Sequence, residues 1–63
     1  MSEFGLMLKV ARLKRGLTQL ELARALGVRE NLISLIETGR QAPTPELREK
    51  LEALLGLLEL KAS

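Results

Sequence analysis

Apolar residues recur along this chain with a helical period, and glycines interrupt that period at regular intervals. In the first segment the apolar positions follow i, i+3, i+4 and i+7, which is typical of a helix with one buried face: Phe4, Met7, Leu8 and Ala11. Five glycines divide the chain into pieces of helical length: Gly5, Gly16, Gly27, Gly39 and Gly56. The pattern predicts a first helix over about residues 4–15 and further helices between the later glycines.

The second predicted helix has the clearest start in the chain. Thr18 and Glu21 have the spacing of a capping box, in which each residue satisfies a backbone N–H group of the other. We expect this helix to run from Thr18 to Gly27. A third helix, over about residues 30–38, carries Ile33 and Ile36 on its inward side.

The last predicted helix begins at Thr44 and Pro45, a capping residue followed by a proline in the first helical position. We expect it to span about residues 45–61. Its leucines are spaced like one buried seam: Leu47, Leu51, Leu54 and Leu58. Gly56 is a point where it ends, kinks or gives way to a short fifth helix.

Composition favours an all-α fold and excludes several chemistries. The 63 residues contain few β-branched side chains and no cysteine or histidine. Disulfides, thiolate or imidazole metal ligands and histidine-assisted catalysis are therefore excluded. With no paired carboxylates either, we expect no enzyme activity, no metal and no cofactor, and no small-molecule ligand is evident. No apolar run reaches membrane-spanning length and no signal peptide is recognisable, so we expect one cytoplasmic domain over residues 1–63.

Charge is distributed unevenly. Residues 1–29 carry six basic and two acidic side chains, whereas residues 30–63 carry four basic and six acidic ones. This asymmetry favours one electropositive face and a polyanionic partner, although ordinary surface lysines and arginines would also account for it.

The sequence predicts two short helices over about residues 18–38, joined by three residues, which is a helix-turn-helix pattern. Ala23 is small enough for the two helices to approach, Gly27 permits a tight turn, and Val28 plugs the space between them. At about 100° per residue, the outward face of the third helix carries Asn31, Ser34, Leu35 and Thr38, with Leu32 at its edge. A convex helix of this length fits the DNA major groove.

These residues resemble the Cro/C1-type (XRE-like) helix-turn-helix domains of phage and bacterial repressors. The motifs GLTQ at residues 16–19, ELA..LGV at 21–28 and IE.G at 36–39 are specific in combination, and the resemblance covers residues 4 to about 54. It implies a compact bundle of four or five helices, a lambda-repressor-like DNA-binding domain. It also implies an ion pair between Arg12 and Glu37, which we favour over a phosphate contact by Arg12.

The resemblance assigns double-stranded DNA as the partner. We expect base contacts from the third helix: Arg29, Glu30, Asn31, Ser34 and Leu35. We expect phosphate contacts from the start of the second helix, the end of the first and the loop after the third: Gln19, Lys14, Arg15, Arg40 and Gln41. Other interpretations stay open, because a single exposed leucine is common and an acidic residue such as Glu30 is favoured at any helix start.

The chain contains sixteen leucines, which is more than the core of a domain of this size can readily bury. We expect a homodimer surface at the C-terminal end, formed by Leu55, Leu57, Leu58 and Leu60. The predicted function is a homodimeric, sequence-specific transcriptional regulator, in the first place a repressor that binds a near-palindromic operator. The alternative is a protein-interaction module, antitoxin-like or an adaptor, with little DNA affinity and a partner protein on the leucine-rich end.

Overall fold

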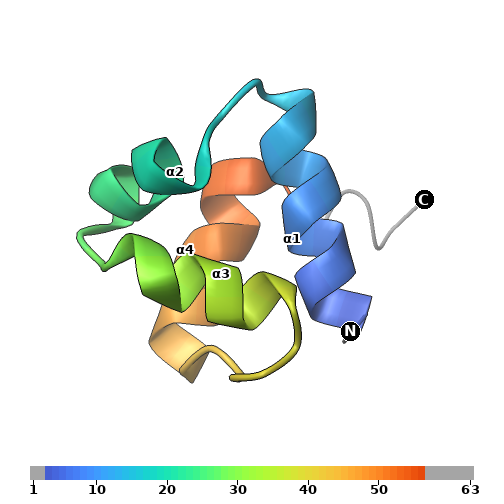
Figure 1. Cartoon of the computed structure of the whole chain (residues 1–63), viewed down its shortest axis with the longest axis vertical. Coiled ribbons are helices and arrows are strands. Elements are labelled where there is room, and N and C mark those ends of the chain that lie inside the picture. Colours follow the sequence, from blue (N-terminus) through green and yellow to red (C-terminus); the bar gives the residue numbers. More distant parts are fainter. Residues whose placement is uncertain (1–2, 57–63) are drawn as a thin grey trace.

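The computed structural model describes residues 3–56, which form four α-helices and no strand (Figure 1). They are α1 (Glu3–Lys14), α2 (Gln19–Leu26), α3 (Glu30–Glu37) and α4 (Pro45–Leu55). The predicted all-α fold is confirmed, and the first three helices match their predicted bounds to within one residue. Within residues 3–56, no helix has the length and apolar character needed to cross a membrane.

The core is a single apolar cluster to which all four helices contribute. In Figure 1, α1 and α2 lie on opposite sides, α3 runs in front between them, and α4 lies behind α3. The cluster consists of Leu8, Ala11, Leu22, Ala23, Ile33, Ile36, Leu47, Leu51 and Leu55. Phe4, Met7, Leu17, Leu26, Val28 and Leu32 pack around it and are partly buried. The inward positions expected for the first three helices therefore face this cluster or its edge.

Gly5 has a different role from the one predicted. It does not separate two elements but lies inside α1, buried against the main chain of α3. A Cβ atom at this position would meet the carbonyl oxygen of Ile36 and would lie 2.6 Å from that of Glu37. Gly5 therefore permits the close approach of α1 to α3.

The buried seam of α4 also differs from the prediction. Leu47, Leu51 and Leu55, each four residues apart, are buried, whereas Leu54 is 43% exposed. The expectation that Leu55 faces a second chain is wrong, because it is 3% exposed within this chain. Gly56 ends α4 in a left-handed conformation (φ 66°), so the helix does not continue unbroken toward residue 61. Leu57, Leu58 and Leu60 lie outside the described residues.

Candidate nucleic-acid interface

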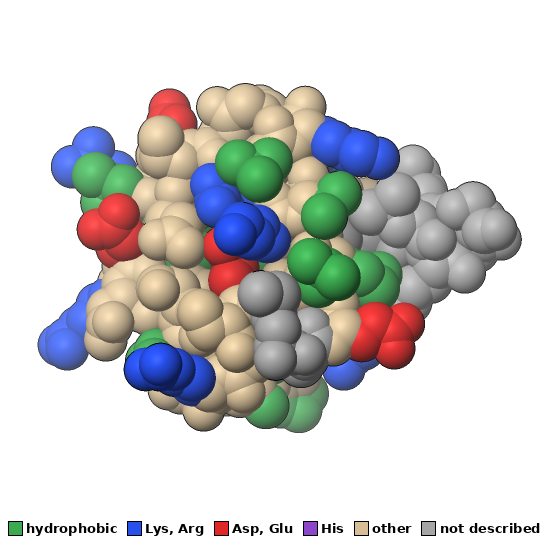
Figure 2. Space-filling view, turned by 45° about the vertical axis from the view of Figure 1, so that its right-hand side comes forward, with side chains coloured by type: hydrophobic (Ala, Val, Ile, Leu, Met, Phe, Trp, Pro, Cys, Tyr) green, Lys and Arg blue, Asp and Glu red, His purple; other side chains and the backbone are tan. Residues whose placement is uncertain are grey.

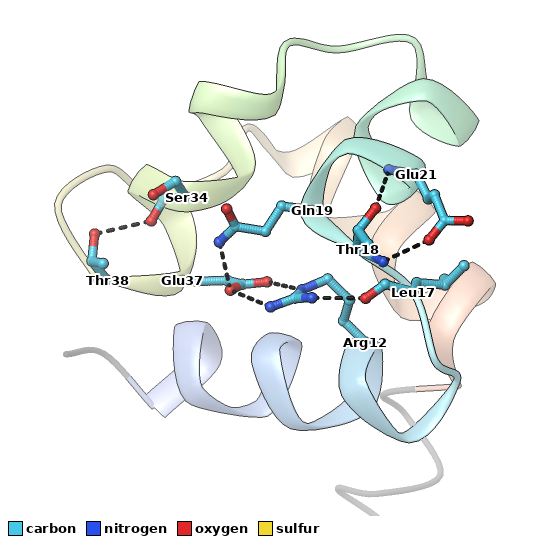
Figure 3. Close-up of polar contacts among 8 residues, drawn as sticks. All are labelled: Arg12, Leu17, Thr18, Gln19, Glu21, Ser34, Glu37 and Thr38. Carbon is cyan, nitrogen blue, oxygen red and sulfur yellow. Dashed lines mark hydrogen bonds and ion pairs between the residues drawn. The ribbon is translucent and has the colours of Figure 1, made fainter.

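Reciprocal hydrogen bonds fix the first turn of α2. The hydroxyl of Thr18 accepts the N–H of Glu21 at 3.0 Å, and the N–H of Thr18 donates to the Glu21 carboxylate at 2.9 Å (Figure 3). This is the predicted capping box. Hydrogen bonding to Thr18 lowers the pKa of Glu21 below its ordinary value of 4.5. The backbone N–H of Thr18 has the larger effect and its side chain the smaller one. The cap therefore favours the charged carboxylate.

The turn between α2 and α3 has the conformation that its sequence requires. Gly27 adopts φ 72°, a left-handed value that is unfavourable for side chains with a Cβ atom. The N–H of Val28 then bonds to the carbonyl of Ala23 at 3.0 Å, while its side chain packs against the core. The three residues 27–29 thereby hold the start of α3 at one position relative to α2.

A buried ion pair joins α1 to α3. Arg12 donates from Nε to Oε2 of Glu37 at 2.7 Å and from a terminal nitrogen to Oε1 at 3.2 Å (Figure 3). Its other terminal nitrogen donates to the carbonyl of Leu17 at 2.7 Å. Arg12 is 7% exposed and Glu37 2%. This is the expected pair, and it ties α1, α3 and the loop before α2 together.

Gln19 joins the same network, a contact that the sequence analysis missed. Its side-chain amide donates to Oε1 of Glu37 at 3.1 Å. Across residues 3–56 every buried side-chain nitrogen and oxygen has a hydrogen-bond partner. One N–H group of the Gln19 amide is thus fixed inward at the start of α2. Gln19 as a whole is half-buried, so part of its side chain is open to solvent.

The outward face of α3 lies opposite this network. Asn31 and Thr38 are exposed, and Ser34 and Leu35 are half-buried. The hydroxyl of Thr38 bonds back to the carbonyls of Ser34 and Leu35, at 3.0 and 3.2 Å, so it is already engaged at the end of the helix. At the other end Arg29, in extended backbone conformation, makes no side-chain capping hydrogen bond within residues 3–56.

The loop after α3 folds back onto the outward face. The carbonyl of Leu35 accepts the N–H groups of Arg40 and Gln41, at 2.9 and 3.3 Å. A surface hollow of about 250 Å³ results, lined by Arg29, Asn31, Leu32, Leu35 and Gln41. The sequence predicted Gln41 in the loop after the third helix but not its place beside this hollow. The bonds of Gly39 to Ile36 and of Arg40 to Leu35 form a Schellman motif, and the glycine that it requires (φ 78°) is its signal in the sequence.

The basic residues at the end of α1 diverge. Lys14 lies two residues after Arg12, about 200° further around the helix, so it is directed away from α3. Arg15 follows the last residue of α1 and is exposed at the start of the loop that leads to α2. Of the two, Arg15 lies in the segment that leads to Gln19 at the start of α2.

The outward side of α1 carries an apolar stripe that the sequence analysis did not identify. Leu6, Val10 and Leu13 are 51%, 40% and 57% exposed, and their spacing puts them on one face. Figure 2 brings this side of the molecule forward and shows apolar side chains gathered right of centre, with basic side chains nearby. Leu6, Val10 and Leu13 have the helical spacing i, i+4 and i+7, so this second apolar stripe is visible in the sequence as well.

Comparison with known protein families gives a match to a helix-turn-helix family. Residues 8–61 match the model of a family described as helix-turn-helix, which covers more than half of the chain. No curated protein and no solved structure matches the chain significantly.

Proposed function

The chain belongs to the Cro/C1-type (XRE-like) helix-turn-helix family of DNA-binding regulators, and we propose that it is a homodimeric transcriptional repressor. It binds a near-palindromic operator through the major groove and acts in the cytoplasm, on the nucleoid when bound. The family is in general not one of enzymes.

One observation carries the proposal: α3 is rigidly held on its inner side while its outer side is open to solvent. Ile33 and Ile36 are 0% and 1% exposed, and Glu37 is bound by Arg12 and Gln19. A helix fixed in this way presents a constant set of side chains to the groove, which sequence-specific binding needs.

The base contacts come from the leading end and outward face of α3. Asn31 is exposed and bonds to adenine through N7 and N6, and Arg29 bonds to guanine. Glu30 accepts from cytosine, while Ser34 and Leu35 contact the bases one turn further along. Such a bidentate contact discriminates against the wrong base by about 1–3 kcal/mol.

The phosphate contacts come from the ends of neighbouring elements. Gln19 uses its second amide N–H, and Arg15 and Arg40 supply positive charge on either side of α3. Lys14, on the far side of α1, contributes to long-range attraction rather than to a direct contact. These contacts supply affinity for any sequence and make binding depend on salt.

Dimerisation follows from apolar surface at the end of α4. Leu54 is exposed and lines, with Ala25, Leu26, Lys50 and Ala53, a hollow of about 460 Å³. Three further leucines, at positions 57, 58 and 60, follow in the sequence and lie outside the described residues. The molecule measures 30 × 22 × 20 Å, so a two-fold pair can hold its α3 helices about 34–36 Å apart, one DNA turn.

Two exposed leucines allow a matched test of the dimer surface. Leu54 and Leu20 are 43% and 40% exposed, but Leu20 lies at the start of α2. Leu54→Lys should shift the dimer toward monomer in sedimentation equilibrium, and Leu20→Lys should not. Equal behaviour of the two variants would argue against a dimer through this end.

The DNA contacts are tested by two substitutions with different expected signatures. Asn31→Ala should relax specificity at one position of the site, because it removes a base contact. Arg40→Ala should weaken binding to every duplex alike and reduce the slope of log K against log salt by about one unit. Fluorescence anisotropy titrations at several salt concentrations measure both, and equal losses on all sequences for Asn31→Ala would refute base contact.

A protein-interaction module is the second candidate, and the exposed stripe of Leu6, Val10 and Leu13 favours it. A partner helix with an apolar ridge and acidic flanks suits this stripe, since Lys9 and Lys14 adjoin it. If this candidate is right, the chain binds duplex DNA only weakly and without sequence preference, and Leu13→Lys abolishes the hetero-complex.

A further inference from the structure

The exposed apolar residues of α1 form one continuous face, here called the α1 stripe: Leu6, Val10 and Leu13. At about 100° per residue, this face is directed almost opposite to the buried Leu8 and therefore away from the core. A single exposed leucine needs no explanation, but three large apolar side chains in a row on one helix face suit contact with another helix.

The charges beside the α1 stripe differ between its two flanks. Glu3 and Lys14 lie on the same flank, about 20° apart around the helix and about 16.5 Å apart along it. Lys9 lies on the opposite flank. All three side chains are exposed, and the ion pairs formed within residues 3–56 involve none of them. One flank thus carries an acid near the start of α1 and a base near its end.

A flank with this order of charges is complementary to itself when two copies of α1 lie antiparallel. A two-fold axis perpendicular to both helices brings the same flank of each copy together, so Glu3 lies opposite Lys14 of the second copy, and the reverse. At about 1.5 Å per residue, this register sets Leu6 level with the gap between Val10 and Leu13 of the second copy. Packed helices interdigitate in this way. The charges and the apolar residues therefore favour the same register.

We propose that the α1 stripe is a surface through which two copies of this chain associate, with their α1 helices antiparallel. The contact uses no residue of α3 and none of the apolar residues around Leu54. It is therefore distinct from the proposed DNA contacts and from the proposed dimer surface, and a chain with both surfaces can join one dimer to the next. An acidic partner helix, the alternative occupant, would leave Glu3 facing a like charge.

The size of the contact sets its expected strength. Three half-exposed apolar side chains from each copy make a smaller contact than the roughly 1,200–2,000 Å² that stable interfaces bury. Lys9 also lies close to the two-fold axis and faces Lys9 of the second copy, which opposes the pairing. We therefore expect association at about 0.1–1 mM in free solution. The pairing is stronger where a shared DNA duplex or the other dimer surface holds two copies close together.

Dilution of the wild-type chain from about 1 mM to 0.01 mM, followed through its backbone amide signals in NMR, tests the proposal. The signals of Leu6, Val10 and Leu13 should shift with concentration, separately from any change in α4. Leu13→Lys should abolish these shifts. The matched control is Leu20→Lys, which changes a leucine that is 40% exposed on α2 and should leave the shifts unchanged.

Charge reversals identify what the stripe binds. Glu3→Lys and Lys14→Glu should each weaken the association about tenfold, because each turns two attractive pairs into two repulsive ones. The variant with both changes should regain the wild-type affinity. A mixture of the wild type with Lys9→Glu should associate more strongly than either protein alone, because the flanks that meet at the axis then carry opposite charges.

Three results would overturn the proposal. The first is a set of α1 signals that do not depend on concentration up to about 1 mM. The second is stronger association of Glu3→Lys, which would mean that the stripe binds an acidic surface instead of a second α1. The third is a double variant that stays as weak as the single ones, which would exclude the antiparallel register. None of these results bears on DNA binding, which the selection of an operator tests separately.

Discussion

Removing one partner of the ion pair between Arg12 and Glu37 should cost far more stability than removing both. Arg12→Met leaves a carboxylate that is 2% exposed and that keeps, among residues 3–56, the Gln19 amide as its side-chain hydrogen-bond partner. Glu37→Met leaves the Arg12 guanidinium, which is 7% exposed and still donates a hydrogen bond to the carbonyl of Leu17. In each single variant a buried charge lacks its counter-charge, whereas the double variant has neither charge.

The magnitude follows from burial. Breaking a buried ion pair by removing one partner costs about 3–5 kcal/mol, whereas replacing both partners by apolar residues is often neutral. The double variant still leaves the Leu17 carbonyl without its donor, which costs about 1 kcal/mol. At roughly 0.05–0.15 kcal/mol per residue, a chain of 63 residues has only about 3–9 kcal/mol in total. Each single variant should therefore be close to unfolded, and the double variant should fold.

Urea unfolding followed by circular dichroism, on the wild type, both single variants and the double variant, measures this difference. Arg24→Met, which removes an exposed charge from α2, is the control and should change stability by less than about 0.5 kcal/mol. If the two single losses simply add in the double variant, the pair is not coupled and the account of how α1 holds α3 is wrong.

Three smaller predictions concern the caps and the contact between α1 and α3. Arg29→Ser should raise the unfolding free energy by about 1 kcal/mol and weaken operator binding; stabilisation without weaker binding would exclude Arg29 from the interface. Gly5→Ala should lower the melting midpoint, with a cost of about 1–3 kcal/mol, because its methyl meets the carbonyl of Ile36. Glu21 has a lowered pKa, so its contribution is present above its ordinary value of 4.5 and is lost as pH falls through its folded-state value. Between about pH 6 and pH 3 the wild type should therefore lose more stability than Glu21→Gln.

Local signals in the sequence predicted the helices well, because caps and turns depend on neighbouring residues. Thr18 with Glu21, Thr44 with Pro45, and Gly27 each have the predicted geometry in the structure. The Arg12–Glu37 pair, separated by 25 residues, was expected from family resemblance rather than from any local pattern.

Packing between elements could not be predicted in the same way. Leu54 and Leu55 are adjacent leucines on the last helix, and only the position of α4 against α1 decides which of them is buried. Gly5 was counted among the glycines that separate helices. Its packing against α3 involves residues far away in the sequence, so the residues next to Gly5 do not indicate it. The hollow beside Leu35 depends on where the following loop returns, so its lining residues required the structure.

Selection from a random duplex DNA library at about 150 mM salt, followed by sequencing of the bound DNA, tests the central claim most directly. The account predicts an enriched inverted repeat whose half-site centres lie about 10–10.5 base pairs apart, the spacing of two α3 helices in a two-fold dimer. Weak, salt-sensitive binding with no enriched sequence would contradict it, and the exposed leucines of α1 and α4 would then indicate a protein partner.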